Sequence, residues 1–450
     1  MKMKIDLQKL YEKGIELHHY ANTAYPLNGS KVWRDYKINT ELVDEAVREQ
    51  WKDVKELALY IHIPFCDSRC KYCEYTVLSG DESNLKQEYV ELLQREMELY
   101  QEMLGRENRT IVGLDLGGGT PTALSSKEIG KIVNSALEGL DLTDNFSISI
   151  ETTPKIATDL EKMVNIRKAG IERISMGIQT INPELLEYLG RQNNTVQIIK
   201  KANENIRAAG FKRFNIDLMY GFANQPLDSF ISTVKFAIDL NPEYITLYRN
   251  RYKGTILEQE SIQISLDKIN QQYDAAYSLL TENGFEANIG KNTFSRIPND
   301  PGTSAYLTKR VIEGMPYLGL GLGSQTMARE SVYYNQGAAS KKIGKYRELI
   351  QQGRFPVQDL YVLPPEEIMA KMICVSFYFG YINRKAFYKK FGIELEDKFK
   401  DEVNFLQDKG LMEFSSDLFL LTKTGKDSIN GIIPLFYSQS SRDNLLNKSG

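Results

Sequence analysis

The chain has 450 residues, of which 42% are hydrophobic and 26% charged, the composition of an ordinary soluble globular protein. This length exceeds what one compact core usually serves, so a large domain with smaller flanking units is expected. Lys plus Arg (56) nearly balance Asp plus Glu (59), for a formal net charge of -3. Because a general nucleic-acid-binding protein needs a basic excess to neutralise phosphates, this balance argues against a nucleic-acid partner.

The chain begins without an apolar run of signal-peptide length, and no later run approaches the roughly 18 apolar residues of a membrane span. Three of the four cysteines are clustered, which in the absence of a secretory signal indicates a metal site and not a disulfide framework. We therefore expect a cytoplasmic protein. Cys374 lies in an apolar run, and we expect it to be a buried structural thiol.

Residues 1–50 are predicted to form an N-terminal arm, with a polar helix followed by an irregular segment. His18 and His19 lie near the end of that helix. The pair could bind a metal or haem, but adjacent helical positions point about 100° apart, which favours a solvated or structural pair.

Short β-branched runs then alternate with longer amphipathic runs. The predicted strands are Leu57–Ile63, Ile111–Leu116, Phe146–Glu151, Arg173–Gly177, Phe214–Met219 and Tyr244–Leu247. About six βα units predict an α/β fold with a parallel sheet and crossover helices. Six units are too few for a closed eight-fold barrel, so we expect a partial, open (β/α)6 barrel within a core that spans residues 51–355.

The glycine-rich run Tyr317–Ser324 is predicted to be either a strand and tight turn over a ligand or a place of close backbone packing. Residues 356–450 are predicted to form a C-terminal winged-helix-like domain, with three helices and a hairpin. Such modules often bind DNA, but the acidic region Glu394–Asp401 favours a substrate cover or an internal docking unit.

Three cysteines follow the first predicted strand with the spacing C-x3-C-x2-C, at Cys66, Cys70 and Cys73. Three close thiolates on a loop can bind three irons of a 4Fe–4S cluster and leave one iron open, as catalytic metal sites do. Functional groups on βα folds gather at the C-terminal ends of the strands, which is where this loop lies.

The run Gly117-Gly118-Gly119-Thr120-Pro121 follows the second strand. Its glycines let the backbone approach a small polar ligand closely. A lone triple glycine is more often an ordinary turn, but its place beside the cysteine loop strengthens the functional interpretation.

Polar residues at or near the ends of the next three strands are the remaining candidates. Glu151 can accept hydrogen bonds from ribose hydroxyls, and the Arg191 fork suits a carboxylate. Gln179 ends the fourth strand, and Asp217 is a charge in an apolar strand that must be paired or face the interior. Each could be a capping residue, but four together indicate one polar ligand site.

These residues lie in motifs that resemble a known family: Tyr-x-His-Ile-Pro-Phe-Cys, Gly-Gly-Gly-Thr-Pro, Ser-Met-Gly-Ile-Gln, Leu-Gly-Arg and Asn-Ile-Asp-Leu-Met-Tyr-Gly. They resemble the radical S-adenosylmethionine (SAM) superfamily and, within it, the oxygen-independent coproporphyrinogen III oxidase family. That family includes coproporphyrinogen dehydrogenase, a haem chaperone, anaerobic haem-opening methyltransferases and class C radical SAM methyltransferases.

The resemblance implies that Cys66, Cys70 and Cys73 bind a 4Fe–4S cluster whose open iron takes SAM. The SAM contacts that it implies are Tyr60, Tyr72, Gly118, Gly119, Thr120, Glu151, Gln179, Arg191 and Asp217, and two SAM molecules side by side are also implied. A flavodoxin or ferredoxin-like donor would supply the electron that cleaves SAM. The resulting 5′-deoxyadenosyl radical would remove a hydrogen atom from a tetrapyrrole or another conjugated small molecule. No further catalytic residue is predicted.

Two departures from the family pattern leave the type of reaction undecided. Coproporphyrinogen dehydrogenase has a further cysteine two residues after the third, where this chain has Tyr75. The segment Leu247–Lys253 replaces a small-residue segment, and its basic side chains could pair with propionates or form a solvated edge. Oxidative decarboxylation and radical methyl transfer are both compatible with these features. The alternative is a haem chaperone carrying the cluster. The chaperone of this family usually starts near its cluster motif, whereas about 60 residues precede the motif here.

Overall fold

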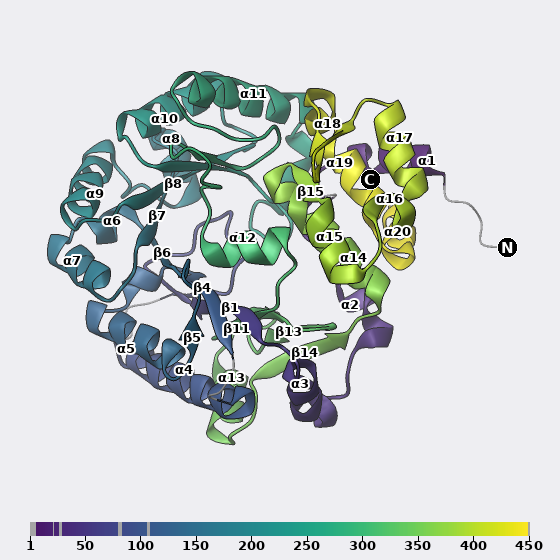
Figure 1. Cartoon of the computed structure of the whole chain (residues 1–450). Helices are drawn as coiled ribbons and strands as arrows, with labels where there is room; N and C mark the ends of the chain where they lie inside the picture. Colours follow the sequence, from purple (N-terminus) through teal and green to yellow (C-terminus); the bar gives the residue numbers. More distant parts are fainter. Residues whose placement is uncertain (1–5, 21, 27–28, 80–82, 106–108, 449–450) are drawn as a thin grey trace.

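One twelve-stranded sheet organises most of the molecule (Figure 1). The structure is a computed structural model, and it describes residues 6–20, 22–26, 29–79, 83–105 and 109–448. Its parallel middle runs in the order β9 (Tyr244–Arg249), β8 (Arg213–Tyr220), β7 (Arg173–Gln179), β6 (Ile148–Thr152), β4 (Thr110–Gly118), β1 (Glu56–Ile63) and β11 (Tyr317–Leu320). The first six of these strands are the predicted ones, so the expected partial barrel is confirmed.

Crossover helices cover the outer face of the parallel strands and form an arc in Figure 1. They are α4 (Ser83–Leu104), α5 (Ser126–Leu137), α6 (Pro154–Ala157), α7 (Leu160–Lys168), α8 (Pro183–Leu189), α9 (Val196–Ala208), α10 (Leu227–Asp239) and α11 (Leu266–Glu282). Helix α5 shows why they form, because a capping box of Ser125 and Glu128 starts it and its apolar residues recur at helical spacing on the buried face. The main core therefore lies between the sheet and these helices.

Short antiparallel strands extend the sheet at both edges. They are β10 (Thr293–Ser295) beside β9, and β12 (Gln325–Met327), β13 (Ser331–Asn335) and β14 (Val357–Val362) beyond β11. A further short strand, β5 (Asp141–Leu142), pairs in parallel with β4. In the glycine-rich run, a side chain at Gly319 would overlap the Gln325 carbonyl, and Gly321 packs against the His62 carbonyl. Close backbone packing is thus the reason for these glycines.

Helix α12 (Ala305–Ile312) lies inside the ring of strands and packs on β4 and β1 (Figure 1). Gly113 permits this approach, because a Cβ there would lie 2.6 Å from the Tyr306 amide nitrogen. Tyr306 in turn stacks on Tyr60, with ring centroids 5.8 Å apart. The open barrel is therefore closed on one side by a helix from the segment between β10 and β11.

The C-terminal module has the predicted winged-helix-like arrangement. Its helices are α14 (Pro365–Ser376), η5 (Phe377–Phe379), α15 (Arg384–Phe391), α16 (Leu395–Lys398), α17 (Lys400–Asp408), α18 (Lys423–Asp427), α19 (Ile429–Ile432), η6 (Ile433–Phe436) and α20 (Gln439–Leu446). Its three-stranded sheet has the order β15 (Tyr381–Asn383), β17 (Leu418–Leu421) and β16 (Met412–Ser415). Cys374 on α14 is fully buried.

The N-terminal arm packs on this module and on the edge of the sheet. Its elements are α1 (Leu7–Glu16), α2 (Gly29–Val32), η1 (Arg34–Tyr36), η2 (Thr40–Leu42) and α3 (Val43–Trp51). The buried Glu367 carboxylate on α14 accepts hydrogen bonds from the Tyr25 hydroxyl at 2.5 Å and from Trp33 Nε1 at 2.9 Å. The arm and the module thus share one core. Within the described residues, no helix is long and apolar enough to cross a membrane.

We expect Glu96→Leu to destabilise the fold. The buried Glu96 carboxylate accepts hydrogen bonds from Gly321 N–H at 2.8 Å, Asn335 Nδ2 at 2.6 Å and the Tyr346 hydroxyl at 2.6 Å. Leucine would leave three buried donors unpaired, a cost of about 3 kcal/mol or more. Denaturant unfolding followed by circular dichroism measures this. The control is Glu98→Leu on the exposed face of the same helix, and an equal loss in both variants would contradict the expectation.

Candidate functional site

The cysteine loop begins where β1 ends and continues through the short strand β2 (Phe65–Cys66), which pairs with β3 (Leu78–Ser79). All three loop cysteines are free thiols and are partly exposed. The loop turns back on itself, because Cys73 N–H donates to the Cys70 carbonyl at 3.1 Å and the Arg69 guanidinium donates to the Cys73 carbonyl at 3.1 Å. The three predicted ligands therefore lie on one short turn at the C-terminal edge of the sheet.

The chemistry of this donor set fits a cationic cluster. Burial raises the pKa of the Cys66 thiol to about 11, and charge on Cys70 and Cys73 adds to the effect. Burial also raises the pKa of Cys73. A cationic, sulfur-binding group would therefore favour the thiolates of Cys66 and Cys73. Across the described residues, no three His, Cys, Asp or Glu side chains converge so as to hold a single metal ion.

The glycine-rich loop lies directly against the cysteine loop, because β4 pairs in parallel with β1. A Cβ at Gly119 would lie 2.7 Å from the Phe65 carbonyl oxygen and 3.1 Å from Cys66 Sγ. The next side chain, Thr120, has its hydroxyl 3.4 Å from Cys66 Sγ. Only glycine fits at position 119, so the loop forms a tight cradle around the first cysteine.

Arg191 connects the cysteine loop with the fourth predicted strand. Its guanidinium donates to the Tyr72 hydroxyl at 2.8 Å and to the Gly177 carbonyl at 2.8 Å, and it lies 3.6 Å from Cys70 Sγ. Helix α8 ends at Gly190 in the left-handed conformation, which turns the chain toward the site. Tyr72 and Arg191, predicted as members of one site, are thus in direct contact.

Gly118, Glu151 and Gln179 lie at or next to the ends of neighbouring strands, and Tyr60 lies inside β1, three residues before its end. Tyr60 and Gly118 both lie against His62, whose Nδ1 is 3.2 Å from the Tyr60 hydroxyl. Gln179 has a φ of 70°, which is rare outside glycine. Its buried Oε1 has no hydrogen-bond partner among the described residues. Backbone strain together with an unpaired amide oxygen is typical of a ligand site.

The carboxyl groups of the interior stay partly neutral without a ligand. Burial raises the pKa of Glu151 to about 8, and the charges of Asp217 and Asp115 add to this rise. Burial raises the pKa values of Asp115 and Asp217 to about 6 each. Glu151 is therefore largely protonated at neutral pH and becomes a better anion when a cationic group binds beside it.

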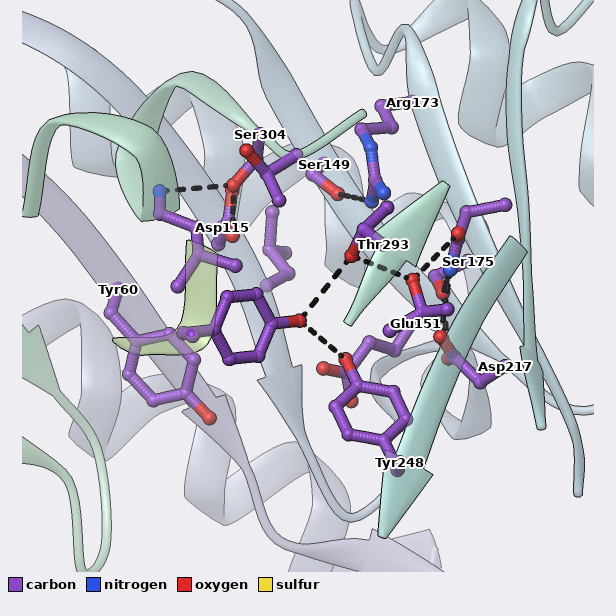
Figure 2. Close-up of a pocket in the computed structure, with 16 residues that line it drawn as sticks. Tyr60, Asp115, Ser149, Glu151, Arg173, Ser175, Asp217, Tyr248, Thr293 and Ser304 are labelled. Carbon is purple, nitrogen blue, oxygen red and sulfur yellow. Dashed lines mark hydrogen bonds between the residues drawn. The ribbon is translucent and has the colours of Figure 1, made fainter. Parts of the chain in front are cut away.

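A polar cleft continues from these strand ends into the barrel (Figure 2). Closed βα barrels fill this space with branched apolar side chains, whereas here Ser304 Oγ donates to Asp115 at 2.6 Å and Arg173 donates to Ser149 Oγ at 3.3 Å. The residues predicted from the sequence do not include Asp115, Arg173 or Ser304. Asp115 carried the signal that identified Asp217, a charge inside an apolar strand.

A chain of hydrogen bonds joins the cleft to the C-terminal module. Asn215 Nδ2 donates to Asp217 at 2.7 Å, and Thr246 Oγ1 donates to Asn215 Oδ1 at 2.9 Å. The hydroxyls of Thr246 and Thr293 lie 3.1 Å apart, and Thr293 lies 3.5 Å from the Tyr378 hydroxyl. Tyr378 belongs to η5, so the C-terminal module contributes a wall of the cleft.

The two arginines of the basic segment Leu247–Lys253 contact other parts of the chain, although Arg251 and Lys253 remain exposed. Arg249 donates to Asn430 Oδ1 at 2.9 Å and lies 2.8 Å from His18 Nδ1. Arg251 donates to Thr23 at 3.1 Å and pairs with Glu74 of the cysteine loop at 3.5 Å. Burial and Arg249 lower the pKa of His18 to about 4. These residues hold the arm, the barrel and the module together.

The match to known proteins agrees with this geometry. Residues 60–237 match the family model described as the radical SAM superfamily, a stretch that contains every predicted cluster and SAM residue. This part of the chain is similar to the radical SAM superfamily, a family that implies a 4Fe–4S cluster and SAM.

Among individual proteins, the chain is similar to coproporphyrinogen III oxidases and to a haem chaperone. The chain is 25% identical to oxygen-independent coproporphyrinogen III oxidase of Helicobacter pylori (strain J99), over 83% of this chain and 84% of that one. It is 33% identical to the haem chaperone HemW of Haemophilus influenzae, over 43% of this chain and 50% of that one. Coproporphyrinogen III oxidase (HemN) of Escherichia coli has a similar solved structure, with a TM-score of 0.72 at 23% identity, over 88% of this chain and 93% of that one. The predicted family resemblance is confirmed, and the relatives include both an oxidase and a chaperone.

We expect Gly119→Ala to abolish stable cluster binding while the chain still folds. The added methyl group would overlap the Phe65 carbonyl and press on Cys66 Sγ, so the cysteine loop must shift. Iron content and visible absorbance after anaerobic reconstitution measure the loss, and circular dichroism measures folding. Gly130→Ala is the matched control, because a Cβ there meets nothing within 4 Å. Full iron loading of the Gly119 variant would show that the cradle is not needed.

Proposed function

We propose that this protein is a radical SAM enzyme that uses a 4Fe–4S cluster to cleave SAM reductively and modify a tetrapyrrole-like or other conjugated small molecule. The reaction would be an oxidative decarboxylation of the coproporphyrinogen oxidase type or a radical methyl transfer. The observation that carries the proposal is Arg191, whose guanidinium contacts Tyr72 and Cys70 of the cysteine loop and the Gly177 carbonyl of β7. One cation therefore connects the cluster-binding turn with the polar strand ends.

The described contacts support a division of roles. Cys66, Cys70 and Cys73 would bind three irons, and when bound, the cluster and SAM would supply one-electron reduction and hydrogen-atom removal. Gly118, Gly119 and Thr120 would hold the amino group of SAM, and Arg191 its carboxylate. Glu151 would accept hydrogen bonds from the ribose hydroxyls. Tyr60, Tyr72, Gln179 and Asp217 would complete the site.

The surroundings of the site support a small-molecule substrate. The cleft is bounded by α12 on one side and by Tyr378 of the C-terminal module on another, which would keep bulk water from the reacting groups. Its polar continuation toward Arg173 would accept a second ligand, and a second SAM is the one that the family resemblance suggests. We also propose a cytoplasmic location and a flavodoxin or ferredoxin-like electron donor.

Production of 5′-deoxyadenosine tests the proposal. Anaerobically reconstituted protein with dithionite and SAM is expected to form it, as measured by liquid chromatography and mass spectrometry. Cys70→Ala is expected to form none, whereas Cys374→Ala, which removes a buried thiol remote from the loop, should retain turnover. If wild type and Cys70→Ala gave the same result, the proposal would be wrong.

The haem chaperone is the second candidate, and the 33% identity to HemW favours it. Mass spectrometry of anaerobic reactions with coproporphyrinogen III and with haem separates the two. A changed tetrapyrrole formed together with SAM products supports the enzyme. Stoichiometric haem capture with no SAM-derived product supports the chaperone.

SAM affinity is expected to rise between pH 7 and pH 9. Glu151, whose pKa is raised to about 8 by burial, goes from about one-tenth ionised to about nine-tenths ionised over this range. Ribose hydroxyls donate to the ionised form, and the sulfonium of SAM is attracted to it. Equilibrium dialysis with reconstituted protein should show a Kd that falls by up to about nine-fold. Glu151→Gln cannot titrate, so it reports any titration of SAM itself, and an identical pH profile in this variant would remove Glu151 from the ribose site.

A further inference from the structure

His62 is a buried side chain beside the predicted SAM residues, and the proposed function gives it no role. It lies near the end of β1 and is 3% exposed. Its two ring nitrogens face different partners. Nε2 lies 2.8 Å from the Thr76 carbonyl oxygen, and Nδ1 lies 3.2 Å from the Tyr60 hydroxyl. A neutral imidazole carries one proton, so the position of that proton decides the direction of both hydrogen bonds.

The Thr76 carbonyl fixes the tautomer of His62. A carbonyl oxygen only accepts hydrogen bonds, so the imidazole proton is on Nε2. Thr76 is itself fixed, because its hydroxyl donates to the Gly337 carbonyl at 2.9 Å. Burial lowers the pKa of His62 to about 4, which agrees with a neutral ring at physiological pH. Nδ1 is therefore a bare hydrogen-bond acceptor.

A bare Nδ1 sets the direction of the Tyr60 hydroxyl. The hydroxyl has a single hydrogen, and the hydrogen bond to Nδ1 forms only if Tyr60 donates it. The Tyr60 ring is held in place by stacking on Tyr306, with 25° between the two ring planes. Tyr60 lines the polar cleft (Figure 2). Its oxygen therefore meets a ligand in the cleft with lone pairs and without a hydrogen to donate.

The glycine-rich loop leaves the space that this arrangement needs. A Cβ at Gly118 would lie 2.7 Å from His62 Nδ1, so a side chain there would displace the imidazole. A Cβ at Gly117 would lie 3.1 Å from the Tyr60 hydroxyl oxygen and 3.0 Å from Glu151 Oε1. Both oxygens are thus close to one point above Gly117. A ligand group that reaches this point meets two oxygens from two different strands, β1 and β6.

We propose that His62 is a positioning residue that fixes the Tyr60 hydroxyl as a hydrogen-bond acceptor, so that Tyr60 and Glu151 together bind the ribose hydroxyls of SAM. This inference rests on the proposed function, since it adds a residue to the same site. With the proton on Nδ1 instead, His62 would donate to Tyr60, and Tyr60 would turn its own hydrogen toward Glu151. The carboxylate would then be occupied by the protein and lost to the ligand. The tautomer of His62 therefore decides whether the site accepts hydrogen bonds from a ligand.

Nitrogen NMR tests the tautomer directly and needs no ligand. The chain has three histidines, so reconstituted protein with ¹⁵N-labelled histidine gives three imidazole pairs, and His62→Asn removes the pair of interest. We expect His62 to show a protonated Nε2 and a bare Nδ1, distinguished by their couplings to the ring protons. In Tyr60→Phe the Nδ1 resonance should move downfield, because it loses its hydrogen bond. A proton on Nδ1, or an unchanged Nδ1 resonance in Tyr60→Phe, would overturn the inference.

Two substitutions separate the roles of the two nitrogens, with SAM affinity measured by equilibrium dialysis. An asparagine side chain can replace Nδ1 of histidine, and a glutamine side chain can replace Nε2. His62→Asn keeps an acceptor for Tyr60, so we expect the Kd to change less than about two-fold. His62→Gln keeps the hydrogen bond to Thr76 but frees the Tyr60 hydroxyl, so we expect the Kd to rise about five-fold. The control is His19→Gln in the N-terminal arm, which should leave the Kd unchanged.

A double-mutant cycle shows whether His62 acts through Tyr60. Tyr60→Phe removes the acceptor oxygen and is expected to raise the Kd about five-fold. Adding His62→Gln to Tyr60→Phe should cause no further loss, whereas a purely structural role of His62 would make the two losses multiply. Multiplied losses, or equal Kd values for His62→Asn and His62→Gln, would overturn the inference. Circular dichroism of each variant confirms that it folds.

Formation of 5′-deoxyadenosine, measured on the same preparations, tests the proposed function separately. A bare Nδ1 on His62 and the expected set of SAM affinities, without SAM cleavage, would refute the proposed reaction and support the positioning role. SAM cleavage by a protein whose His62 carries its proton on Nδ1 would do the reverse.

Discussion

The parallel pairing of β1 with β4 is the constraint on which the site depends. Its register aligns Ile63 with Gly118, so the loops that follow the two strands must lie side by side. One loop carries the cysteines and the other the glycines, and Gly119 leaves no space between them. Behind β1, the Tyr89 hydroxyl of α4 donates to the His62 carbonyl at 2.6 Å. The position of the cysteine turn is thus set by strand pairing and by the helix packed behind it, more than by contacts within the loop.

The polar barrel interior has a cost in free energy. The neighbouring carboxyl groups of Glu151 and Asp217 have raised pKa values, since ionising them without a cation is unfavourable. Part of this cost is offset by hydrogen bonds, such as the one that Ser175 Oγ donates to Asp217 at 2.7 Å. The apolar core therefore lies outside the ring of strands, where α4 to α11 cover the sheet. Stability comes from that outer layer, and the interior is left available for binding.

The sequence was sufficient for the features that depend on local pattern. Strands rich in β-branched residues, helices with apolar faces and motifs such as the Cys66 loop are encoded within short windows. The edge strand β10 has three residues and pairs only with β9, where Thr293 lies opposite Thr246. Arg249 could not be assigned, because its partners His18 and Asn430 lie 231 and 181 residues away. Asp115 is different, because its local signal was visible and was applied only to Asp217.

The same long-range contacts explain why the C-terminal module acts as part of the site. Its sheet edge is pressed against the barrel, where a side chain at Gly380 would overlap the Ile289 carbonyl and one at Gly290 would lie 2.8 Å from Leu421 Cδ1. Asn270 Nδ2 donates to the Asp427 carbonyl at 3.0 Å on another side of the contact. A module fixed in this way has its hairpin region engaged with its own chain. Because Tyr378 stands in the cleft as a result, the winged-helix-like unit shapes the space beside Glu151.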